Sequence, residues 1–170
     1  MRHGQGTQVW ANGSRYEGYW ANDEHNGHGR MIYVDASYYK GFWQDNERHG
    51  RGVLVRADST VYDGEWADDE QEGNGREQWH DGTFEGQYHK GFRHGLGKFV
   101  MYDGSSYEGN FASNKMEGDG LYKWPNGSYY HGMFKDNKMD GSGVFVYTDG
   151  RRYEGDFVND KKSGHGVLKW

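Results

Sequence analysis

Residues 107–127 read YEGNFASNKMEGDGLYKWPNG, and this stretch decides the fold because its pattern recurs along the chain. An aromatic-Gly-aromatic motif recurs seven times, at Tyr16-Gly18-Trp20, Tyr39-Gly41-Trp43, Tyr62-Gly64-Trp66, Phe84-Gly86-Tyr88, Tyr107-Gly109-Phe111, Tyr130-Gly132-Phe134 and Tyr153-Gly155-Phe157. A Gly-x-Gly motif recurs eight times, at Gly4/Gly6, Gly27/Gly29, Gly50/Gly52, Gly73/Gly75, Gly95/Gly97, Gly118/Gly120, Gly141/Gly143 and Gly164/Gly166. Successive copies lie about 23 residues apart, with a single step shorter by one, and such a period indicates stacked structural repeats.

Each repeat has the pattern of a β-hairpin. In the fifth repeat, Lys98–Tyr102 is rich in strand-forming residues, Asp103-Gly104 predicts a two-residue hairpin turn, and Ser106–Phe111 predicts the returning strand. The same turn is predicted at Asn12-Gly13, Asp81-Gly82, Asn126-Gly127 and Asp149-Gly150. No window shows a sustained apolar period characteristic of a helix, so helices are not expected.

Two of the predicted turns lack glycine. They read Asp35-Ala36 and Asp58-Ser59, so we expect a different turn type or mild strain there, because only glycine tolerates positive φ without steric cost. The one-residue deletion falls beside the fourth turn, between Gly82 and Phe84. Polar connectors of constant length, such as Ala112–Glu117, predict that each hairpin docks on its predecessor in the same way.

Composition excludes several classes of protein. The chain has 170 residues and no cysteine, which excludes a disulfide framework and a thiolate zinc site. Its net charge is −6 and it has no run of Lys and Arg, which argues against nucleic-acid binding. With 7 Trp, 14 Tyr and 8 Phe it is too aromatic to be disordered. No apolar stretch resembles a signal peptide or a membrane span, so we expect an intracellular protein.

Glycine alternates with aromatic residues along the returning strand of each hairpin. Side chains two residues apart share one face of a strand, so each glycine leaves room between two rings for another ring. We expect both glycines of the Gly-x-Gly motif to do the same. The rings then form columns that are either core or the lining of an open groove. The candidates for a partner-binding groove are Trp20, Trp43, Trp66, Tyr88, Phe111, Phe134, Phe157, Tyr16, Tyr39 and Tyr62.

These motifs together resemble the MORN (membrane occupation and recognition nexus) repeat. The resemblance is carried by Tyr107-Glu108-Gly109-Asn110-Phe111, by Gly118-x-Gly120 and by Trp124-Pro125-Asn126-Gly127, and it covers essentially the whole chain. It implies an all-β fold, an elongated single-layer antiparallel meander of stacked hairpins. We expect one array over residues 1–170, with seven full repeats from Gly4 and a C-terminal half repeat at residues 164–170.

No pattern of residues predicts catalysis, a metal or a cofactor. The histidines beside the repeat glycines recur at the repeat spacing and form a ladder, not a cluster; they are His3, His28, His49, His94 and His165. The recurring carboxylates predict a solvated face; they are Glu17, Asp63, Glu85, Glu108 and Glu154. No Gly-x-Gly pair continues into a dinucleotide or phosphate-binding motif.

The resemblance implies a non-catalytic scaffold for protein partners, in a cytoskeletal or membrane-skeleton assembly. The last predicted strand ends without a partner, so Val167, Leu168 and Trp170 are candidates for an edge that joins two copies end to end. One alternative is a module that binds phospholipid at a membrane surface. Another is a regulatory segment of a larger enzyme, such as a lipid kinase or a SET methyltransferase.

Overall fold

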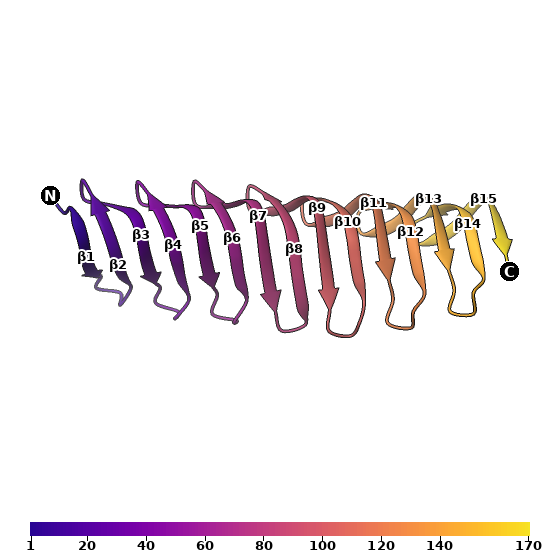
Figure 1. Cartoon of the computed structure of the whole chain (residues 1–170), viewed down its shortest axis with the longest axis horizontal. Helices are drawn as coiled ribbons and strands as arrows, with labels where there is room; N and C mark the ends of the chain where they lie inside the picture. The colour runs from indigo at the N-terminus through magenta and orange to yellow at the C-terminus, as the bar shows by residue number, and fades with distance from the viewer. The chain divides into compact units, whose positions relative to one another are not determined.

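The computed structural model describes all residues from Met1 to Trp170, and it contains strands and turns but no helix. Its fifteen strands are β1 Gly4–Val9, β2 Arg15–Ala21, β3 Glu24–Ile32, β4 Tyr38–Gln44, β5 Glu47–Val55, β6 Val61–Ala67, β7 Glu70–Trp79, β8 Gly82–His89, β9 Phe92–Met101, β10 Ser106–Ala112, β11 Lys115–Lys123, β12 Tyr129–Lys135, β13 Lys138–Val146, β14 Arg152–Val158 and β15 Lys161–Lys169. The strand order of the sheet follows the order of the chain (Figure 1). The prediction of an all-β antiparallel meander of hairpins is confirmed.

The chain folds as two compact units. The first comprises Met1–His80 with Tyr88–Gly91, and the second comprises Asp81–Gln87 with Phe92–Trp170. Within each unit, every strand pairs antiparallel with the next, and the repeat glycines lie in register. In the first unit the aligned glycines are Gly6, Gly18, Gly29, Gly41, Gly52, Gly64 and Gly75. In the second they are Gly97, Gly109, Gly120, Gly132, Gly143, Gly155 and Gly166.

The polar connectors are much shorter than predicted. In the segment Ala112–Glu117, only Ser113 and Asn114 lie outside strands, because β10 ends at Ala112 and β11 begins at Lys115. Both residues have positive φ, 47° and 68°, as a two-residue type I′ hairpin turn requires. Asn and Asp adopt this conformation more easily than other non-glycine residues, so the turns need no glycine.

The hairpin loops, except in the fourth hairpin, are longer than predicted. Asn12-Gly13 was expected to form a two-residue turn, but only Gly13 has positive φ, at 92°. The Gly13 amide donates to the Trp10 carbonyl at 2.9 Å, and the Trp10 amide donates to the Ser14 carbonyl at 2.9 Å, so a type I turn is followed by one left-handed residue. The Asn12 side chain accepts from the Ser14 amide at 2.9 Å. The Asn or Asp therefore serves as a hydrogen-bond acceptor in the loop.

The two loops without glycine keep this same conformation. The Ala36 amide donates to the Tyr33 carbonyl at 3.0 Å, and the Ser59 amide donates to the Arg56 carbonyl at 2.9 Å. Ala36 and Ser59 have φ of 67° and 68°, so they occupy the left-handed region with a side chain. A different turn type or mild strain was expected in these two loops, and the turn type is unchanged while the backbone is strained. The fourth hairpin carries the deletion in its turn as expected, but the predicted turn Asp81-Gly82 is wrong by one residue. The turn consists of His80 and Asp81, since β7 ends at Trp79 and β8 begins at Gly82.

The two glycines of each Gly-x-Gly motif have different roles, which corrects the expectation that both make room for rings. The first, such as Gly27 with φ of 78°, lies at an irregularity in the pairing of β2 with β3 and is required by its backbone conformation. The second, such as Gly29, is required by space, because a Cβ there would collide with the ring of Tyr16.

Candidate functional site

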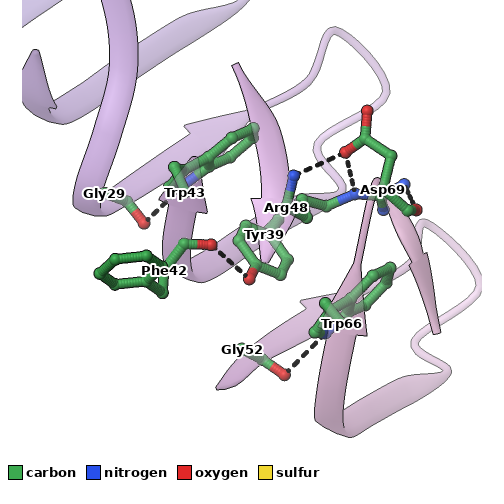
Figure 2. Close-up of polar contacts among 8 residues, drawn as sticks. All are labelled: Gly29, Tyr39, Phe42, Trp43, Arg48, Gly52, Trp66 and Asp69. Carbon is green, nitrogen blue, oxygen red and sulfur yellow. Dashed lines mark hydrogen bonds and ion pairs between the residues drawn. The ribbon is translucent and has the colours of Figure 1, made fainter. Parts of the chain in front are cut away.

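In each unit, one face of the sheet is a layer of interlocked rings. In each repeat the first aromatic residue folds over the glycine of its own strand and the second glycine of the next. The hydroxyl of Tyr39, for example, donates to the Phe42 carbonyl at 3.0 Å (Figure 2). A Cβ on Gly41 or Gly52 would collide with this ring. Tyr16, Tyr62, Tyr107 and Tyr130 make the equivalent bond. The row of glycines thus leaves a flat strip of backbone on which the phenol rings lie.

The second aromatic residue of each motif packs edge-on against two of these rings. Trp43 meets Tyr39 of its own strand at a centroid distance of 5.1 Å and Tyr16 of the preceding repeat at 5.6 Å. Its indole nitrogen donates to the Gly29 carbonyl at 3.3 Å (Figure 2). In the second unit Phe134 meets Tyr130 at 5.2 Å and Tyr107 at 5.1 Å. Such edge-to-face pairs substitute for a deep core in a thin protein.

A cation covers many of these rings and connects one repeat to the next. The guanidinium of Arg48 lies 4.3 Å from the centroid of Trp66, and its Nε donates to Asp69 at 3.0 Å (Figure 2). Arg2 lies over Trp20 in the same way, at 3.9 Å. The amide of Asp69, the second residue of a type I′ turn, donates back to the Arg48 carbonyl at 3.1 Å. Asn46, Asn114, Asn137 and Asp160 make the same bond to the repeat before them, so the hairpins dock alike, as predicted.

The titratable groups in this layer are held in their neutral forms. Burial raises the pKa of Tyr16 and of Tyr130 to about 12, and it raises those of Tyr39, Tyr62 and Tyr107 as well. Burial, aided by the charge of Arg2, lowers the pKa of His25 to about 4, and its ring stacks on Tyr16 at 3.7 Å. These shifts follow from desolvation, and they accompany packing rather than acid–base chemistry.

The opposite face of the first unit carries an open groove of about 910 Å³. Its floor is the glycine row from Gly6 to Gly52, where no side chain rises from the sheet on this face. One wall follows the register row just beyond the glycines and consists of Thr7, Glu17, Arg30, Lys40, Val53 and Asp63. The other side of the groove is lined by Gln5, Tyr19, His28 and Arg51. The aromatic layer thus lies on one side of the sheet and the groove on the other, and charged side chains within the groove face the solvent.

The repeat assignment agrees with this geometry. The family model for the MORN repeat matches residues 1–15, 16–38, 39–61, 62–83, 84–106, 107–129, 130–151 and 153–170. The chain belongs to the MORN repeat family. Most matched MORN segments begin at the first aromatic residue of the motif, the ring that lies on the glycine row.

Solved structures resemble this MORN array at low sequence identity. The TCP domain of Drosophila melanogaster SAS-4 (dCPAP), in complex with a proline-rich motif of Ana2 (dSTIL), is 12% identical over 98% of this chain and 89% of that chain, with a TM-score of 0.44. The TCP10 domain of Danio rerio CPAP, in complex with a peptide of Danio rerio STIL, is 15% identical over 99% and 90%, with a TM-score of 0.39. No curated protein matches the chain.

The structure places the ten rings that were candidates for a groove in the packed interior of the MORN array. None exceeds 6% exposure, because each ring is covered by rings or cations of its own and neighbouring repeats. The open groove lies on the other face and is lined by none of them. Contact between a partner and these rings stays a prediction, but the surface that the array offers consists of other side chains.

The candidate residues for self-association are placed differently. Val167 and Leu168 lie on β15, which pairs with β14 only, and they are half exposed; Trp170 follows the strand and is 93% exposed. No group of three or more His, Cys, Asp or Glu side chains could hold a metal ion. The structure has no helix long and apolar enough to cross a membrane.

Sequence reasoning missed the residues that line the groove. A signal was present at Lys40, because this position, immediately before the glycine of the aromatic motif, is Glu, Asp or His in the other six motifs. The carboxylates at this position were interpreted only as a solvated face. The sequence alone could not show that this row forms the wall of a groove, since that depends on how neighbouring strands align.

Proposed function

We propose that this MORN array is a non-catalytic scaffold that binds an extended segment of a partner protein in the groove of the first unit. The observation that carries the proposal is the open groove of about 910 Å³, which combines a bare glycine floor with polar and apolar walls. Side chains at the glycine positions would point toward the aromatic layer, so on the groove side this row is bare backbone, and a peptide can lie along it between the two walls. The MORN family suggests a cytoskeletal or membrane-skeleton assembly as the setting.

The groove suits a short extended segment. Its floor crosses β1 to β5 from Gly6 to Gly52, which corresponds to about 19 Å at roughly 4.8 Å per strand spacing. An extended chain advances about 3.3 Å per residue, so about six residues would fit. Val53 and Tyr19 offer apolar contact on opposite sides, and the charged residues between them offer specificity.

A bulky residue in the groove tests the proposal. Val53→Trp would fill the groove from a half-buried wall position without touching the aromatic layer. Val144→Trp is the matched control, because Val144 holds the same place after the second glycine of its repeat, in the other unit. Proteins captured from extracts by the wild type and by Val144→Trp, but lost with Val53→Trp, would support groove binding. Thermal denaturation would show that both variants fold.

Photo-crosslinking locates the contact directly. A benzoylphenylalanine at position 53 should form crosslinks to a segment of the captured partner, while the same residue at position 144 should not. Equal capture by the Val53→Trp variant, together with crosslinks from position 144 only, would show that the groove of the first unit is not the binding surface.

A second proposal concerns association between two copies. β15 exposes one unpaired edge, together with Val167 and Leu168 on the strand and Trp170 beyond it, and unpaired strand edges add to other sheets. Light-scattering molar mass across a concentration series tests it. A dimer that is lost in the Leu168→Lys/Trp170→Lys variant would support pairing through this edge, and a monomer at all concentrations would refute it.

A further inference from the structure

Two cations face each other across adjacent strands in the wall of the groove. Arg30 on β3 and Lys40 on β4 are directly opposed in the antiparallel register, both are exposed, and both line the groove. Like charges at directly opposed positions of a sheet repel each other and destabilise the pairing. A negatively charged group between them, from the protein or from a partner, would relieve this repulsion.

The carboxylates nearest to this pair are already engaged. Glu17 pairs with Arg15, and Asp63 pairs with Arg51 at 3.7 Å. Arg30 rests on the ring of Tyr38, with its guanidinium carbon 4.5 Å from the centroid, and Lys40 forms no ion pair. Glu17, which is directly opposed to Arg30 on β2, is thus held by Arg15, and neither Arg30 nor Lys40 forms an ion pair with a carboxylate of the folded chain.

Comparison among the repeats shows what is unusual about this pair. The opposed pairs at the same two positions in other hairpins are Thr7 with Glu17, Val53 with Asp63, Lys98 with Glu108, Leu121 with His131 and Val144 with Glu154. Where Lys98 faces Glu108, the two side chains form an ion pair at 3.1 Å. A cation at this position of the first strand can therefore bind a carboxylate at the opposed position of the next strand. At Arg30 the opposed residue is Lys40, so no carboxylate is present there.

We propose that the groove takes an acidic segment of a partner protein, with a Glu or Asp carboxylate bound between Arg30 and Lys40. This inference rests on the proposed function and names the chemistry of the partner. The incoming carboxylate would stand in for the acidic residue that other repeats provide at the position of Lys40. Apolar residues on either side of it would contact Val53 and Tyr19.

A protein segment fits this site better than an anionic membrane. The cation pair lies in the wall of a hollow, and Glu17 and Asp63 flank it on the same wall. A flat anionic surface would meet those carboxylates and the net charge of −6 of the chain. A narrow segment with one acidic side chain between apolar neighbours brings a single negative charge, and that charge meets the two cations of this wall.

The test uses two fluorescein-labelled peptides, AVAEAVA and AVAQAVA, whose binding to the full chain is followed by fluorescence anisotropy. We expect the Glu peptide to bind about tenfold more tightly than the Gln peptide, and the difference to shrink at high salt. Lys40→Glu restores the residue type of other repeats, so it should fold, and it should remove the preference. Lys98→Gln, on the same face of the second unit, should leave it unchanged.

The outcomes separate this inference from the proposed function. Equal binding of both peptides, or an unchanged preference in Lys40→Glu, would overturn the inference even where Val53→Trp still abolishes partner capture. If the proposed function itself is wrong, the Val53→Trp variant will capture the partner as well as the wild type does. Sedimentation with phosphatidylserine–phosphatidylcholine vesicles completes the test. If vesicles bind in a manner that depends on Lys40 and neither peptide binds, the ligand of this site is a lipid and not a protein segment.

Discussion

The amide of Arg48 donates a hydrogen bond to the carboxylate of Asp69 at 2.8 Å, and the amide of Asp69 donates back to the carbonyl of Arg48 at 3.1 Å. The Arg48 guanidinium also binds this carboxylate and covers Trp66 (Figure 2). One residue of a tight turn therefore holds the backbone, the side chain and the ring stack of neighbouring repeats together. The stability of the array should depend on such joints more than on any deep core.

Asp69→Ala should lower the free energy of unfolding by about 2 kcal/mol, because it removes the acceptor for both the amide and the guanidinium of Arg48 and also places an alanine at a φ of 66°. Asp69→Asn should cost less, since Asn46 and Asn114 bind the equivalent amides elsewhere in the array. Urea denaturation followed by tryptophan fluorescence measures both. Equal losses in the two variants would mean that the charge, rather than the acceptor, is what matters.

Ala36→Gly should raise the free energy of unfolding by about 0.5–1 kcal/mol, because Ala36 has a φ of 67° that glycine adopts without steric cost. Ala57→Gly is the matched control: it lies in the equivalent loop but has no positive φ, so glycine there should be neutral or destabilising. Thermal melts of the two variants decide the point, and a lower melting temperature for Ala36→Gly would contradict the assignment of strain.

Gln71→Met should stabilise the first unit by about 1 kcal/mol, because the amide nitrogen of Gln71 is buried without a hydrogen-bond partner. Met116 and Met139 stand at the same position in the second unit, so the pocket accepts this side chain. Denaturant titration measures the gain. No change, or a loss, would imply that the rings around Gln71 satisfy its amide group.

His25 should make stability depend on pH between about 4 and 6.5. Burial lowers its pKa to about 4 in the folded state, so in this range the unfolded chain binds a proton that the folded chain does not. Stability is therefore full above pH 6.5 and is lost as the pH falls toward 4, by at most about 1.4 kcal/mol per pH unit. His25→Met should reduce this slope, measured as the difference between the two proteins, since other groups also titrate. Identical slopes would show that the ring is protonated within the fold.

Much of the architecture follows from local patterns. The constant repeat period, the hairpin in each repeat and the pairing of glycine with aromatic residues are set by side-chain size and strand alternation, which are properties of short segments. The roles of the two glycines in each Gly-x-Gly motif could not be separated in this way. Gly27 is defined by its backbone angle and Gly29 by the ring of Tyr16 on the preceding strand, and the sequence shows only two glycines.

The sequence by itself determined the family, the strand number and the residues that alternate along each strand. Only the tertiary structure decided which turn is tight, which rings are buried and where the surface is hollow. The reason is that turn type depends on φ, burial depends on the neighbouring repeat, and the groove depends on the register of several strands. Arg30 and Lys40 are separated along the chain by a hairpin loop, and only the pairing of β3 with β4 makes them neighbours.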